Sequence, residues 1–266
     1  MNRKIMMGLV LLAISITLAV PAVGQTLQSI MVATLAEPNQ KTTEVSTDEL
    51  RRILADGTAT VFDARPHLEW AISHIPGAVN VAPKPGVAIS VYVSDVNEVG
   101  RVLGGNKQAA IVLYCNGPFC GKSKRLAEEL VAAGYGNVRR YQLGVPTWRA
   151  LVGLTEIELE GAMYAFRGDT TTVFIDARST EEFRAGSIPR ARSIPQNQLG
   201  PAKDTGVVKA AKDDGRLPME DHNTRVIVFG KDSAQARAVA NAIAQEAFHN
   251  TSYFVGTFET LRSVLK

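Results

Sequence analysis

Cysteine is scarce in this chain of 266 residues, which holds only two, and aromatic residues make up just 6% of it. Two cysteines in so long a chain exclude the class of small secreted domains built on several disulfides. There is also no large excess of charge of either sign, because the formal net charge is +3. This balance argues against nucleic acid or an anionic membrane surface as a partner. With 45% hydrophobic and 21% charged residues, the chain is suited to one or two globular domains.

A single long apolar stretch lies at the N-terminus, from Ile5 to Val20. It follows two basic residues and precedes small residues at Ala22 and Gly24, which is the pattern of a cleaved secretory signal. We therefore predict a signal peptide over residues 1–24 and a periplasmic or secreted protein with no stable membrane insertion after cleavage. An uncleaved anchor is the alternative, because the stretch approaches the length that spans a bilayer.

The chain repeats itself at a spacing of about 113 residues. The segment Val61–Arg65 (VFDAR) returns as Phe174–Arg178 (FIDAR), and His74–Ala78 (HIPGA) returns as Ser187–Ala191 (SIPRA). A third match follows in the same order near the end of each copy. A repeat of this length is too long for a solenoid and indicates two whole domains.

We place the two predicted domains at residues 40–153 and 154–266, after a linker over residues 25–39. In the first copy, the β-rich run Ile111–Tyr114 precedes the helical pattern Ser123–Ala133, whose apolar residues share one face. Such alternation of short strands and helices predicts an α/β fold. Each domain is expected to be a parallel sheet flanked by helices on both faces.

The loop between this strand and this helix is the strongest candidate for a reactive site. It starts at Cys115 and continues through Asn116, Gly117, Pro118, Phe119, Cys120, Gly121 and Lys122. In an open α/β sheet, ligands bind at the carboxyl ends of the strands. The glycines and the helix start would turn backbone N–H groups toward Cys115 and stabilise its thiolate. Cys115 is therefore the predicted nucleophile, and the same loop could hold an oxyanion.

These segments resemble the rhodanese family of sulfurtransferases over almost all of the chain that follows the predicted signal peptide. Asp63–Arg65, Glu69–Trp70 and His74–Ala78 are similar to the first signature of the family, and Gly144–Trp148 is similar to its closing one. The resemblance implies two tandem rhodanese-like domains. It also implies an enzyme in which Cys115 takes sulfane sulfur from a small anionic donor such as thiosulfate or polysulfide. The resulting persulfide would pass its sulfur to a thiol, to cyanide or to an acceptor protein.

Cys120 leaves several roles open, namely a resolving thiol, a disulfide partner of Cys115 or the nucleophile itself. We favour Cys115 as the nucleophile because a strand end is the less mobile support. A redox or sulfur-carrier module that uses the Cys115/Cys120 pair is the alternative function. A cysteine phosphatase or arsenate reductase fits less well, because Gly121 stands where such enzymes need an arginine. No metal site is expected, because two sulfurs need further ligands and no histidine lies near them in the sequence. No cofactor is expected either.

The second copy lacks the cysteine, because Gly230 stands where Cys115 stands in the first. We therefore predict an inactive second domain that packs against the first and shapes the mouth of its pocket. Asp63 and Arg65 are predicted to form a structural ion pair, since the same two residue types recur in this cysteine-free copy.

Lys122 is expected to attract an anionic donor as a point charge. Surface or packing roles are predicted for the four histidines and the two tryptophans: His67, His74, His222, His249, Trp70 and Trp148.

Overall fold

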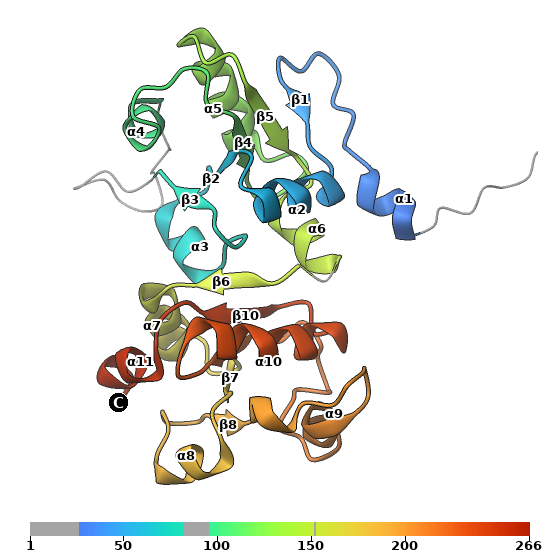
Figure 1. Cartoon of the computed structure of the whole chain (residues 1–266), viewed down its shortest axis with the longest axis vertical. Helices are drawn as coiled ribbons and strands as arrows, with labels where there is room; N and C mark the ends of the chain where they lie inside the picture. Colours follow the sequence, from blue (N-terminus) through green and yellow to red (C-terminus); the bar gives the residue numbers. More distant parts are fainter. Residues whose placement is uncertain (1–26, 82–95, 152) are drawn as a thin grey trace, which may run out of the picture.

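The computed structural model describes residues 27–81, 96–151 and 153–266, and the predicted signal peptide lies outside them. The described residues form two α/β units that follow one another along the longest axis of the molecule (Figure 1). Within these ranges, no helix has both the length and the apolar character that a membrane crossing requires.

The first unit contains a five-stranded sheet in the order β1-β5-β4-β2-β3, with every neighbouring pair parallel. Its strands are β1 (Thr43–Glu44), β2 (Thr60–Asp63), β3 (Val79–Asn80), β4 (Ile111–Tyr114) and β5 (Val138–Tyr141). Its helices are α1 (Leu27–Val32), α2 (Thr47–Asp56), α3 (His67–Ile72), α4 (Val96–Val102), α5 (Gly121–Ala132) and α6 (Gly144–Ala150).

The second unit repeats this topology with the strand order β6-β10-β9-β7-β8, again with every pair parallel. Its strands are β6 (Thr155–Ile157), β7 (Val173–Asp176), β8 (Arg192–Ser193), β9 (Val226–Phe229) and β10 (Thr251–Phe254). Its helices are α7 (Leu159–Gly168), α8 (Thr180–Ala185), the short 3-10 helix η1 (Gln196–Gln198), α9 (Gly206–Asp213), α10 (Ser233–Gln245) and α11 (Phe258–Val264). Two parallel sheets flanked by helices confirm the predicted fold class.

Strand β4 lies inside the first sheet and has the bounds that the sequence predicts. Successive side chains of a strand point to opposite faces. Ile111, Leu113 and Cys115 accordingly belong to one apolar cluster, whereas Val112 and Tyr114 belong to the cluster on the other face. The direction of the Cys115 side chain therefore follows from its position directly after the strand.

Helix α5 begins at Gly121, two residues before the predicted start, and Cys120 is its N-cap residue. The loop after β4 is correspondingly shorter than expected and spans residues 115–120. Within the residues predicted as a linker, the structure contains α1, which packs against α2.

The two units meet where α3 packs against α7. A β-carbon on Gly161 of α7 would lie 2.1 Å from the carbonyl oxygen of Ala71 in α3, so glycine permits this close approach. Beside the helices, His74 and Glu156 exchange two backbone hydrogen bonds of 3.0 and 2.8 Å. The second unit therefore packs against the first, as predicted.

The side chain of His74 is buried at this junction. Its Nδ1 lies 2.9 Å from the carbonyl oxygen of Trp70, and its Nε2 lies 3.1 Å from a carboxylate oxygen of Glu156. Trp70 stacks on the His74 ring, and the buried Trp148 donates a hydrogen bond to the carbonyl of Leu154. These contacts agree with the packing roles expected for this histidine and for both tryptophans.

Candidate active site at the loop after strand β4

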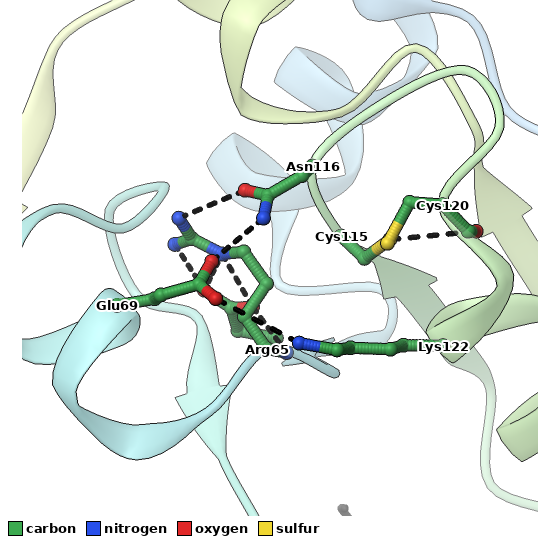
Figure 2. The surroundings of a disulfide bond; sticks show 7 residues. Arg65, Glu69, Cys115, Asn116, Cys120 and Lys122 are labelled. Atoms are coloured by element: carbon green, nitrogen blue, oxygen red, sulfur yellow. Dashed lines mark hydrogen bonds and ion pairs between the residues drawn. A yellow bond between two sulfur atoms is a disulfide. The ribbon is translucent and has the colours of Figure 1, made fainter. Parts of the chain in front are cut away.

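The two cysteines form a disulfide across the loop that joins β4 to α5. Cys115 directly follows the strand, Cys120 caps the helix, and their Cα atoms are 6.5 Å apart (Figure 2). The structure therefore assigns Cys120 one of the roles left open by the sequence, that of a disulfide partner. In this oxidised form neither sulfur is a free thiolate, so nucleophilic chemistry at Cys115 requires reduction first.

The environments of the two sulfur atoms differ. Cys115 is 2% exposed and belongs to the apolar cluster on its face of the sheet, which also contains Leu113 and Leu126. Cys120 is half-buried and lines a cavity of about 530 Å³. The sequence predicts that Cys115 faces an open loop, but in the oxidised structure it is Cys120 that adjoins the cavity.

The described lining of this cavity comes from the first unit alone, from Leu35 to Gln142. The prediction that the second unit shapes the mouth of the pocket is therefore wrong for the described residues. The second unit contacts the first through α3 and α7, and these helices do not contribute to the described lining.

The start of α6 packs directly against the cysteine loop. Val145 donates its backbone N–H to the carbonyl of Cys115 at 3.2 Å. Gly144 adopts a φ of +65°, and a β-carbon on it would lie 2.3 Å from the Gly117 nitrogen and 2.5 Å from the Cys115 oxygen. The segment that resembles the closing rhodanese signature thus lies directly against the loop, and only glycine fits at its first position.

Asp63 and Arg65 form the predicted ion pair, and both are buried. The Arg65 guanidinium donates to both Asp63 oxygens, to the carbonyl of Ser73 and, at 3.5 Å, to the side-chain oxygen of Asn116. Burial works against the charged guanidinium, but the Asp63 carboxylate outweighs it and raises the pKa of Arg65 above its ordinary value. The pair therefore fastens the end of β2 to the first residue of the cysteine loop after Cys115.

The second unit contains the same ion pair without a cysteine beside it. Arg178 donates to Asp176 and to the carbonyl of Gly186, which corresponds to the contact of Arg65 with Ser73. Gly230 follows β9, and its carbonyl accepts the backbone N–H of Phe258. This loop has the same framework and no sulfur, as predicted.

Glu69 of α3 lies on the side of Asn116 that faces away from the disulfide, as Figure 2 shows. Its carboxylate accepts a 2.6 Å hydrogen bond from the side-chain amide of Asn116 and lies 3.7 Å from the Lys122 ammonium. Lys122 was expected to attract an anionic donor, but in the structure its charge is partly balanced by Glu69. The motif that contains Glu69 was visible in the sequence, whereas its contacts 47 and 53 positions away were not.

The rest of the loop is open to solvent. Phe119 is fully exposed and has a φ of +69°, a conformation that is uncommon for residues other than glycine. Pro118 and Gly121 are also exposed, whereas Gly117 is buried against the start of α6. Arg125 pairs with Glu129 on the surface of α5, which leaves the phosphatase alternative without an arginine in the loop.

The profile of the Rhodanese-like domain family matches residues 46–151 and 161–262. The HTH-type transcriptional regulator Rv0324 of Mycobacterium tuberculosis is 32% identical over 106 residues, which are 40% of this chain and 41% of that protein. The chain thus spans about two fifths of the length of that relative.

Two similar solved structures have names that refer to sulfur chemistry. Thiosulfate sulfurtransferase from Pseudomonas aeruginosa is 20% identical with a TM-score of 0.32, over 79% of this chain and 40% of that one. SseA from Escherichia coli, described as a 3-mercaptopyruvate sulfotransferase, is 20% identical with a TM-score of 0.34, over 81% of this chain and 98% of that one.

The two family matches together span most of the chain, and each covers most of one sheet and its helices. The two sheets also have the same strand order. The chain therefore belongs to the rhodanese-like domain family and contains two such domains in tandem.

Proposed function

We propose that this protein is a rhodanese-type sulfurtransferase that works through the Cys115/Cys120 pair. The observation that carries this proposal is the position of Cys115, at the carboxyl end of an inner strand and before a loop that is tied to Arg65 and Gly144. Family membership supports the same reaction class. The active form is the dithiol, because the disulfide has no thiolate to accept sulfur.

In the first step, the Cys115 thiolate attacks the outer sulfur of thiosulfate. The sulfur–sulfur bond of thiosulfate breaks, sulfite leaves with the electron pair of that bond, and a persulfide remains on Cys115. A thiol or cyanide can then attack the terminal sulfur and restore the Cys115 thiolate. Polysulfide would serve as a donor in the same way, with a shorter polysulfide as the leaving group.

Cys120 supplies a second exit from the persulfide. Its thiolate attacks the Cys115 sulfur, the terminal sulfur leaves as hydrosulfide, and the disulfide that the structure contains is formed. Two external thiols then reduce this disulfide and become a disulfide themselves. The position of Cys120 at the helix N-terminus favours its thiolate form, because partial positive charge collects there.

Intact-mass measurement tests the role of each cysteine. The reduced wild-type protein, Cys115→Ser and Cys120→Ser are each exposed to thiosulfate or polysulfide and weighed. We expect Cys120→Ser to keep one added sulfur atom, because its persulfide cannot be resolved internally. Cys115→Ser should gain none, and the wild type should return to the disulfide while releasing hydrosulfide. Sulfur added to Cys115→Ser alone would assign the reaction to Cys120 and contradict the proposal.

The disulfide itself supports a second candidate function, a redox or sulfur-carrier module that binds a partner protein. In that case, the thiol–disulfide equilibrium of the pair is the activity, and both serine variants lose it equally. Catalytic formation of thiocyanate from thiosulfate and cyanide distinguishes the two functions. Turnover by Cys120→Ser is expected of the sulfurtransferase, and its absence in every form supports the module.

Export to the periplasm is also part of the proposal, on the basis of the N-terminal apolar stretch and the small residues that follow it. Expression with a C-terminal tag, followed by cell fractionation and N-terminal sequencing, tests it. We expect a periplasmic protein that begins at Gln25. A full-length cytosolic protein would contradict export without affecting the sulfur chemistry.

A further inference from the structure

The cavity beside Cys120 is closed on one side by a segment that precedes the first rhodanese-like domain match. We call this segment, residues 33–40, the N-terminal strap. Its residues Leu35 to Pro38 line the cavity together with the cysteine loop, Lys124, Arg140 and Gln142. Anything that approaches Cys120 through the cavity therefore meets the strap.

The strap presents one carboxylate to a cluster of hydrogen-bond donors. Glu37 accepts from the Lys124 ammonium at 2.5 Å, from the Arg140 guanidinium at 3.1 Å and from the Gln142 amide at 2.9 Å. The hydrogen bonds from Lys124 and Arg140 outweigh burial and lower the pKa of Glu37. We call Lys124, Arg140 and Gln142 the donor cluster.

The donor cluster has more binding capacity than Glu37 uses. Arg140 is 4% exposed, and its Nε has no hydrogen-bond partner among the described residues. The side-chain oxygen of Gln142 is also buried and unpartnered there, but as an acceptor it adds no capacity for an anion. Buried polar groups are normally satisfied, so an unpartnered guanidinium nitrogen beside a cavity indicates a ligand with more oxygen atoms than one carboxylate.

The strap is held by polar contacts rather than by apolar burial. All of its residues are exposed or half-buried. Besides the contacts of Glu37, its backbone N–H groups at Leu35, Ala36 and Glu37 donate to the carboxylate of Glu44. Contacts between charged and partly exposed groups weaken with salt and exchange readily with dissolved ions.

We infer that Lys124, Arg140 and Gln142 form a binding site for a tetrahedral sulfur oxyanion next to Cys120, and that Glu37 occupies this site as a tethered competitor. Such an oxyanion has three or four oxygen atoms for the donors, against the two of Glu37. The inference rests on the proposed function, in which thiosulfate enters and sulfite leaves at the cysteine pair. Displacement of Glu37 by the oxyanion would loosen the strap, which Glu44 and the hydrogen bond from Gln142 to Gln40 would still hold.

Binding of inorganic sulfate to the oxidised full-length protein tests the site without any sulfur transfer. Sulfate is a tetrahedral dianion like thiosulfate, but it has no sulfane sulfur that could be transferred. Glu37→Gln removes the competitor, so we expect it to bind sulfate at least tenfold more tightly than the wild type in isothermal titration calorimetry. The matched control Glu129→Gln, on the surface of α5, should bind sulfate as the wild type does.

The double variant Glu37→Gln/Lys124→Gln should lose this gain, whereas Glu37→Gln combined with Lys209→Gln, which changes an exposed lysine of the second unit, should keep it. Equal sulfate binding by Glu37→Gln and the wild type would overturn the inference. So would binding that persists without Lys124, which would reveal an adventitious ion only.

Hydrogen exchange of the wild type gives a second readout that needs no variant. Sulfate should accelerate exchange of the backbone amides of Leu35, Ala36 and Glu37, because the strap loosens when Glu37 is displaced. Sodium chloride at equal ionic strength should not do so to the same extent, and an equal effect of both salts would contradict the site. Sulfate binding without persulfide formation would contradict only the proposed function, and persulfide formation without sulfate binding only this inference.

Discussion

Replacement of Gly144 by alanine tests whether close packing of α6 against the cysteine loop stabilises the site. Two costs arise from the structure. The left-handed backbone at a φ of +65° costs an alanine about 1–2 kcal/mol. The added β-carbon would also lie 2.3 Å from the Gly117 nitrogen, and relief of such overpacking costs about 1–3 kcal/mol. We expect Gly144→Ala to destabilise the first domain by roughly 2–5 kcal/mol and to slow persulfide formation.

Gly134→Ala is the matched control, because Gly134 has a φ of +89° and a β-carbon on it would meet no atom within 4 Å. It should cost only the backbone part, about 1–2 kcal/mol, and leave persulfide formation unchanged. Urea unfolding of the oxidised proteins, followed by circular dichroism, measures both losses. Equal destabilisation by the two variants, or normal persulfide formation by Gly144→Ala, would refute the packing argument.

Three further predictions concern the ion pair, the domain junction and the disulfide. Asp63→Asn leaves Arg65 buried without its carboxylate and should lower the free energy of unfolding in urea by about 3–5 kcal/mol. Asp176→Asn should cause a similar loss in the second domain, and a loss below about 1 kcal/mol would contradict a buried pair. Burial raises the pKa of Glu156, but its hydrogen bonds to His74 and other donors outweigh burial and lower this pKa below its ordinary 4.5. The charged carboxylate therefore stabilises the fold above pH 4.5, and this contribution is lost as the pH falls through the lowered pKa. Glu156→Gln should therefore flatten the acid side of the stability profile, and an unchanged pH dependence would contradict this. Reduction of the disulfide should lower the stability of the wild type by about 2 kcal/mol, the value for so short a loop, and should leave Cys115→Ser unaffected when both are unfolded with and without a dithiol.

Several features of the fold could be predicted because their causes are local in the sequence. The run Ile111–Tyr114 is apolar, β-rich and bounded by turn residues, and it forms β4 with those bounds. Asp63 and Arg65 are two residues apart, so their pairing needs only the turn after β2. The repeat showed that the same turn occurs twice, once beside a cysteine and once beside Gly230.

Other features of the site depend on segments that are far apart in the sequence. Glu37 meets Arg140 across 103 positions, and no periodicity or motif connects the two. The same is true of Asn116 and Glu69, which are 47 positions apart in the sequence and meet only in the folded chain. The sequence did not predict that α5 begins at Gly121, because Gly121 and Lys122 are residue types typical of loops. In the structure, Cys120 is the N-cap residue of this helix and is held by the disulfide.

The sequence by itself determined the two-domain α/β architecture, the one loop that carries cysteines and the absence of cysteine from the corresponding loop of the second domain. Each of these follows from patterns within a few neighbouring residues. Only the folded chain decided which sulfur is buried and which adjoins a cavity, since the pleat of β4 turns Cys115 toward the core while the helix start leaves Cys120 at the surface. It also decided which charges face the site, because side chains more than 40 positions apart meet only when strands and helices pack.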